Sequence, residues 1–128
     1  MLVHSFFLEL AQQLGSATHE EAQKKRRGRY YLILNPNADR HQQTLFHVLV
    51  SVKKWLHDEE HVSDQSTVTP YIAEQVRHKV VTTLGQLERS AMITHDREKF
   101  SLIESAYDWW HEVFDDFIID HQLTSTPA

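Results

Sequence analysis

The stretch FSLIESAYDWWHEVFDDF, residues 100–117, decides the fold. Its large apolar residues recur at alternating steps of three and four, which places their side chains on one face of an α-helix. These residues are Phe100, Ile103, Tyr107, Trp110, Phe114 and Phe117. The periodicity predicts a long amphipathic helix, with Thr94 as its N-cap and with Asp96 and Glu98 near its positive end.

Three other segments carry the same helical spacing. Their apolar residues run from Val3 to Leu14, from Leu45 to Leu56 and from Ile72 to Met92. Gly15 suits the end of the first helix, because glycine tolerates the left-handed conformation found there. Asn37 or Asp39 can cap the second helix, and Thr69 before a proline is typical of the start of the third. The polar residues 59–69 predict a loop.

Residues 18–34 carry two conflicting signals. Thr18 and Glu21 match a capping box, which predicts a helix over HEEAQKKRRGRYYLIL that stops at the Asn35-Pro36 break. The run YYLIL favours a strand by propensity. Because a strand with no pairing partner would be marginal, we predict that this run is the apolar end of a helix.

The composition agrees with a helical fold. The chain has 128 residues, 41% hydrophobic and 24% charged, so it can bury a core without cross-links. Glycine and proline number three each, too few for the many turns of an all-β protein. We predict an all-α antiparallel bundle of about four helices, with one domain over residues 1–121 and a disordered tail over 122–128. Aromatic residues are expected to fill its centre: Phe6, Phe46, Trp55, Tyr107, Trp110 and Phe114.

The absence of cysteine excludes disulfides, cysteine-based zinc sites and thiol catalysis, and it favours a cytoplasmic location. The N-terminal MLVHSFFLEL has no positive flank, and Glu9 interrupts it well short of the roughly 20 residues that span a bilayer. We therefore expect neither a signal peptide nor a membrane partner. The net charge of -5 gives no overall reason to expect nucleic acid.

The densest charge feature is KKRRGR, residues 24–29. Cations followed by two tyrosines suit phosphate contacts and base stacking, so this is the candidate site for nucleic acid or another anion. Its residues are Lys24, Lys25, Arg26, Arg27, Arg29 and Tyr30. The alternative is a solvated basic face, which is the more common role of such a run, so nucleic acid is the less favoured partner.

The last predicted helix shows the opposite charge. Four of its carboxylates follow helical steps: Glu104, Asp108, Glu112 and Asp115. Like charges at this spacing cost about 0.2 to 0.5 kcal/mol per pair, and a basic partner would offset that cost. We interpret these residues as an interaction surface that meets KKRRGR within one molecule or across a homodimer; the alternative is that both are solvated. The apolar surface of Trp109 and Phe117 left outside the main stripe also suggests a dimer interface.

Two arrangements of histidine resemble metal sites. His57, Glu60 and His61 match the His-x-x-Glu-His order of inverted zinc proteases. His57 with His61, and His111 with Asp116, partly resemble the iron ligands of hemerythrins. Because ten histidines make such spacings common by chance, solvent-exposed histidines are the preferred interpretation, and we expect no metal or other cofactor.

Arg89 and His95 show the Arg-x5-His spacing of the helical HEPN ribonucleases. Here the pair spans a predicted helix boundary, so a solvated Arg89 near a helix end is the preferred interpretation. We assign no catalytic residue.

An ungapped series of residues runs through roughly the C-terminal half of the chain: Pro70-Tyr71-Ile72, Glu74-Gln75-Val76, Leu84, Arg89-Ser90 and Lys99-Phe100 followed by Ile103. In this series the chain resembles the YppE-like family, small helical proteins of Gram-positive bacteria. Residues 15–40 depart from that family's pattern. The resemblance implies a compact antiparallel helical fold, no known activity and no catalytic residues.

These observations favour a non-enzymatic interaction or regulatory module with an unknown protein partner, acting through charged surfaces or a helix groove. One alternative is a nucleic-acid-binding protein that uses residues 24–31. The other is a metal-binding or RNA-cleaving helical protein.

Overall fold

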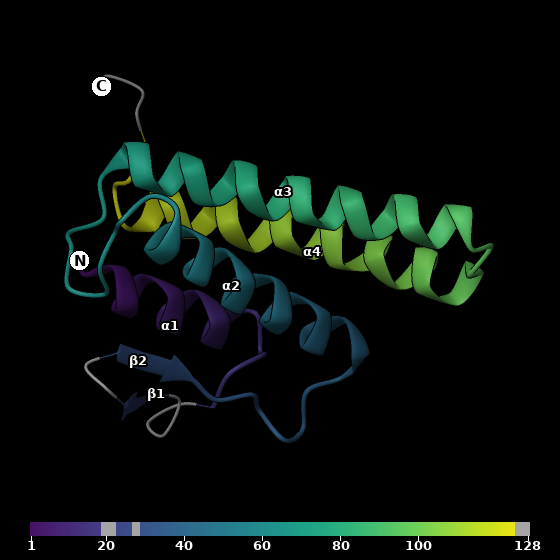
Figure 1. Cartoon of the computed structure of the whole chain (residues 1–128), viewed down its shortest axis with the longest axis horizontal. Helices are drawn as coiled ribbons and strands as arrows, with labels where there is room; N and C mark the ends of the chain where they lie inside the picture. The colour runs from purple at the N-terminus through teal and green to yellow at the C-terminus, as the bar shows by residue number, and fades with distance from the viewer. Residues whose placement is uncertain (19–22, 27–28, 125–128) are drawn as a thin grey trace.

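The computed structural model describes residues 1–18, 23–26 and 29–124, with side chains for all of these except 23–26 and 29. Within them, four helices and one hairpin follow each other along the chain (Figure 1). Their bounds are α1 Val3–Gln13, β1 Gln23–Arg26, β2 Arg29–Leu32, α2 Arg40–Asp58, α3 Pro70–Ile93 and α4 Arg97–Asp120. The helices pack on one another around a shared core, which confirms the predicted all-α bundle.

The helices alternate in direction. In Figure 1, α1 and α3 run one way, α2 and α4 run the other, and the α3–α4 pair extends well beyond the end of α1. Helix α1 has 11 residues, whereas α3 and α4 have 24 each, so at about 1.5 Å per residue α1 covers less than half of their length. One half of the bundle therefore has four helices, and the other half has α2, α3 and α4 alone.

The core contains residues from all four helices. Most of the predicted core aromatics are buried as expected: Phe6, Phe46, Trp110 and Phe114. Trp55 and Tyr107 lie half-buried at its edge, where the Tyr107 hydroxyl donates to the Val81 carbonyl oxygen at 3.0 Å. Phe117 is fully buried in the same core, so its expected role at a dimer interface is wrong. Trp109 is half-buried, with its ring centroid 4.6 Å from that of His41.

The caps of α2 and α3 are those predicted. Asp39 forms a capping box with Gln42, in which its carboxylate accepts from the Gln42 backbone N–H at 2.9 Å. Thr69 accepts from the backbone N–H of Ile72 at 3.2 Å, and Pro70 follows it. Both caps satisfy N–H groups that have no partner within the helix.

The predicted cap of α4 is wrong. Thr94 ends α3, where its hydroxyl donates to the Ser90 carbonyl oxygen at 2.9 Å. Asp96 caps α4 instead, and its carboxylate accepts from the Lys99 backbone N–H at 3.0 Å. A carboxylate also interacts favourably with the positive end of the helix dipole, which a hydroxyl cannot do.

Helix α1 ends at a glycine for a steric reason. Gly15 has φ +68°, and a Cβ there would lie 2.4 Å from Nε2 of Gln42. Glycine adopts this left-handed conformation without strain, and a side chain there would also displace the end of the Gln42 side chain.

The predicted helix over residues 19–34 is wrong where the structure describes it. Residues 23–26 and 29–32 pair as an antiparallel hairpin, with Gln23 opposite Leu32 and Arg26 opposite Arg29. The partner that YYLIL needed is the basic run just before it, whose like charges would repel at helical spacing. An isolated hairpin is marginal, so contacts with the helices must hold it in place. Glu21 of the predicted capping box lies outside the described residues.

The loop at residues 59–69 joins α2 to α3, as predicted. It also holds the N-terminus, because Val3 donates to the Ser66 carbonyl oxygen and Val68 to that of Met1, both at 2.8 Å. Of the tail at residues 122–128, Leu123 is 9% exposed and packs on the core, and residues 125–128 lie outside the described part. None of the helices described is both long and apolar enough to cross a membrane.

Candidate functional site

The predicted anion-binding segment forms the hairpin. The structure describes only the backbone of Lys24, Lys25, Arg26 and Arg29, and Arg27 lies outside the described residues. The ring of Tyr30 is half-buried and stacks on His4 of α1, with centroids 4.6 Å apart and an angle of 26° between the rings. Tyr30 therefore packs the hairpin on the bundle and is not an open surface for base stacking.

A buried ion pair holds strand β2 on the bundle. Lys53 Nζ, from α2, lies 3.3 Å from Oδ1 of Asp64 in the 59–69 loop, and the two side chains are only 12% and 9% exposed. Lys53 Nζ also donates to the Tyr30 carbonyl oxygen at 2.6 Å, and the Tyr30 N–H donates to Asp64 Oδ2 at 3.1 Å. Both backbone polar groups of Tyr30 are thus satisfied by charged partners, which make stronger hydrogen bonds than neutral ones.

His4 completes this arrangement. Its Nδ1 lies 3.2 Å from Lys53 Nζ, and its backbone N–H donates to the Asp64 carbonyl oxygen at 3.0 Å. An ammonium can only donate, so Nδ1 accepts and the proton of a neutral ring lies on Nε2. We call His4, Tyr30, Lys53 and Asp64 the docking cluster, because it joins α1, β2, α2 and the 59–69 loop.

Burial lowers the pKa of Lys53 from its ordinary value of 10.5, because the charged amine loses its hydration. The negative charge of Asp64 and its hydrogen bond act in the opposite direction and only partly offset this effect. The docking cluster therefore holds a charge that is paired but costly to bury.

The pH dependence of stability should show this cost. Between the lowered pKa of Lys53 and about 10.5, the unfolded chain binds a proton that the folded chain has released, so the contribution of Lys53 to stability rises with pH. We expect urea midpoints of the native chain to gain on those of Lys53→Met as the pH rises toward about 10.5. A constant difference across this range would contradict the prediction.

Tyr107 also contributes to the pH dependence of stability near this range. Burial and the charge of Glu88 raise the pKa of Tyr107 above 10.0, so that the folded chain keeps a proton that the unfolded chain loses. This effect lowers stability as the pH rises above that value, which is the opposite sign. Because the native chain and Lys53→Met both carry Tyr107, its contribution cancels in the difference between them.

A groove opens beside the docking cluster, between β2 and α2. It has a volume of about 320 Å³ and is lined by Tyr30, Tyr31, Leu32, Val50, Lys53, Lys54, His57 and Asp64. We call it the hairpin groove. Tyr31 is 46% exposed and Val50 is 41% exposed, so apolar surface remains open to solvent here. The Lys53 charge is met by Asp64, whereas Lys54 is an exposed cation on the groove's edge.

The strand register adds to this surface. Residues paired across a hairpin share a face, and successive pairs alternate between the two faces. Position 24 pairs with Tyr31, and position 26 with position 29, so these four positions fall on one face. By register, positions 24, 26 and 29 thus share a hairpin face with Tyr31, which is exposed.

The acidic face of α4 is largely open to solvent. Glu104, Asp108 and Glu112 are exposed, and Asp115 accepts from Nη1 of Arg77 on α3 at 2.8 Å. In Figure 1, α1 and α2 lie between the hairpin and α4. The contact expected between the two charged segments stays a prediction, because the side chains of residues 24–29 lie outside the described part of the structure.

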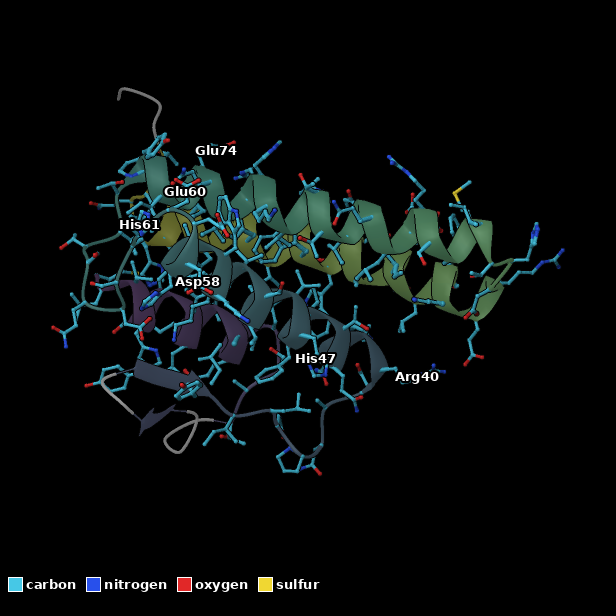
Figure 2. All side chains as sticks on the ribbon, viewed as in Figure 1. Arg40, His47, Asp58, Glu60, His61 and Glu74 are labelled. Carbon is cyan, nitrogen blue, oxygen red and sulfur yellow. The ribbon has the colours of Figure 1, made fainter. Side chains whose placement is uncertain are left out.

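The histidines considered as metal ligands are scattered. Figure 2 shows Asp58, Glu60 and His61 near the C-terminal end of α2, where His57 Nδ1 lies 3.6 Å from Asp58 Oδ1. His111 and Asp116 are exposed along α4. Within the described part of the chain, no group of three or more His, Asp or Glu side chains is placed to hold a metal ion.

Arg89 and His95, the pair with ribonuclease-like spacing, lie at the far end of the α3–α4 pair. Arg89 is exposed near the end of α3, and His95 is exposed in the turn that follows, with φ 56°. A hollow at this turn is lined by His95 and Arg97 but does not include Arg89. The structure therefore does not unite the two residues in one hollow.

Sequence reasoning missed the docking cluster. His4, Lys53 and Asp64 lie on separate segments, and no motif spacing links them. A usable signal exists on α2 alone, because Val50, Lys53, Lys54 and His57 follow helical steps and put three basic side chains on one face.

Comparison with known proteins does not identify a family for this chain. No protein-family model, no curated protein and no solved structure matches this chain.

Proposed function

We propose that this protein is a non-enzymatic interaction module whose hairpin groove binds an acidic segment of a protein partner. The observation that carries the proposal is the combination of open apolar surface, at Tyr31 and Val50, with the exposed cation Lys54 in one groove. Such a groove complements a segment that has one apolar anchor among carboxylates. The docking cluster keeps the groove's two walls together.

The test uses a labelled peptide of aspartates and glutamates around one leucine, with its asparagine–glutamine counterpart as the control ligand. Fluorescence anisotropy should show salt-sensitive binding of the acidic peptide alone. We expect Lys54→Glu to weaken binding about tenfold, because it places a carboxylate against the ligand's carboxylates.

Arg89→Glu is the matched control, because it changes the net charge equally on an exposed residue of α3 far from the groove. Screening should limit its effect to about twofold. Equal losses from the two variants would mean that the peptide responds to net charge, and the hairpin groove would not be its site.

A nucleic acid is the second candidate ligand, favoured by the register that puts positions 24, 26 and 29 on the face of Tyr31. Against it stands Tyr30, whose ring is stacked on His4. A single-stranded oligonucleotide in the same anisotropy assay discriminates the two. Tighter binding than the acidic peptide, with a steep loss in salt, would favour the nucleic acid.

A second copy of this chain is one source of the acidic segment. In Figure 1, α1 and α2 lie between the backbone of the hairpin and α4, which favours a contact between two molecules over one within a single molecule. Light scattering at low and high salt distinguishes this source from a different partner. The resemblance of residues 70–103 to the YppE-like family is likewise a hypothesis, and it implies no activity.

A further inference from the structure

A second groove lies in the half of the bundle that α1 does not cover. It is bounded by α2, α3 and α4 and has a volume of about 380 Å³. Val48 and Ile103, which are 3% and 1% exposed, belong to both this groove and the core. Leu87 and Leu102 are half-buried in its walls. We call it the interhelical groove.

The titratable side chains that line this groove are all basic. His47 and Lys99 line it, and no carboxylate does, although the chain has 18 acidic residues. Figure 2 shows His47 on α2, toward the end that carries Arg40. A neighbouring hollow between α3 and α4 is acidic instead, because Glu88, Glu104 and Asp108 line it. The absence of acidic residues is thus a property of the interhelical groove and not of this part of the surface.

Lys99 is available to a ligand. The two acidic residues nearest to it in the sequence are already engaged: Asp96 accepts from the Lys99 backbone N–H at 3.0 Å, and Glu98 pairs with Arg40. Among the described residues, the Lys99 ammonium forms no ion pair. Its charge is therefore unmatched at the mouth of an apolar groove.

The threonine hydroxyls of the groove need no hydrogen-bond acceptor from a ligand. Thr44 donates its hydroxyl proton to the Arg40 carbonyl oxygen at 2.9 Å, and Thr83 donates to that of Lys79 at 2.7 Å. Both hydroxyls are satisfied within their own helices, so an alkyl group can lie against them without leaving a donor unpaired.

We propose that the interhelical groove binds a medium-chain fatty acid, with its alkyl chain on the half-buried Leu87 and Leu102 and its carboxylate on Lys99. Ligand pockets usually measure about 300 to 1,000 Å³, and this groove lies at the small end of that range, which suits one medium-length chain. The lining supplies apolar contact and one unmatched positive charge, and the ligand supplies the complementary groups. This inference does not depend on the hairpin groove.

The test measures binding of hexanoate, octanoate and decanoate by calorimetry, each below its micellar concentration. Burial of each added methylene should tighten binding about fourfold until the groove is full. Decanol, which lacks the charge, should bind about tenfold more weakly than decanoate, because a hydrogen bond between charged groups is lost. The Lys99→Met variant should bind decanoate no better than decanol.

Two matched variants locate the site. Lys54→Met removes a cation from the edge of the hairpin groove and should leave decanoate binding unchanged. Leu102→Glu places a carboxylate in the interhelical groove and should abolish binding, with circular dichroism confirming that the variant is folded. Both variants keep the docking cluster intact.

Three results would overturn the proposal. Equal binding of decanoate and decanol would show that the charge plays no part. Loss of decanoate binding in Lys54→Met would place the ligand in the hairpin groove. Failure of all three fatty acids, with the acidic peptide shifting the NMR signals of His47 and Lys99, would identify the occupant as a protein segment.

Discussion

Phe6→Ala is expected to lower the free energy of unfolding by about 4 kcal/mol, the usual cost of removing a buried phenylalanine ring. Phe6 has no exposed surface and is the main aromatic link between α1 and α4. Its ring lies edge-on to Phe117 and Phe114, with centroid distances of 5.2 and 6.4 Å. Because α1 is only 11 residues long, it cannot replace these contacts elsewhere along its length.

Urea denaturation with a constant m-value checks this prediction. Leu8→Ala is the matched control, since Leu8 lies on the same helix but is only half-buried. Its expected cost is about half that of Phe6→Ala. If the two substitutions cost the same, α1 is not held to α4 by its aromatic face.

Asp64→Ala is expected to cost about 3 kcal/mol, because breaking a buried ion pair leaves the other charge without its partner. The substitution removes the carboxylate from Lys53 and also the acceptor from the Tyr30 backbone N–H. The hairpin should therefore loosen together with the loss of global stability. Lys54→Ala, at an exposed neighbour of Lys53, should change stability by less than about 0.5 kcal/mol.

Hydrogen exchange at the Tyr30 amide separates the local effect from the global one. In the native chain this N–H donates to Asp64 Oδ2 at 3.1 Å, so its exchange requires release of the hairpin. In Asp64→Ala it should exchange much faster than core amides of α2 and α4. Protection equal to that of the native chain would contradict the role given to the docking cluster.

Helices α2, α3 and α4 could be read from the sequence because local information is sufficient for them. Their apolar spacing is set by 3.6 residues per turn, and caps such as Asp39 and Thr69 act within three residues. The wrong prediction of Thr94 as the N-cap of α4 also concerned residues close together in the sequence. Two capping residues stood close together, and the charged Asp96 is the one that caps α4.

The hairpin was misjudged because its stability is not local. Propensity favours a strand at YYLIL, but a strand is stable only when another strand pairs with it, and no pairing strand was recognised in the sequence. The basic run supplies one partner, while Lys53 donates to the Tyr30 carbonyl oxygen and Asp64 accepts from the Tyr30 N–H. These two residues are 23 and 34 positions away from Tyr30 along the chain.

For the charged segments too, the sequence predicts some features and the tertiary structure decides the others. Composition correctly identified an exposed acidic face at Glu104, Asp108 and Glu112, because exposure of carboxylates follows from their hydration cost. It could not say where the basic segment lies relative to that face. The tertiary structure places α1 and α2 between the backbone of the hairpin and α4.

By itself, the sequence determined that this chain is a bundle of amphipathic helices and where most of them begin and end, because these depend on helical periodicity and nearby caps. It also predicted burial for four of the aromatics: Phe6, Phe46, Trp110 and Phe114. Only the tertiary structure decided the hairpin, the docking cluster and the two grooves. Each of these brings together segments far apart in the chain, and burial makes their few polar contacts strong enough to matter.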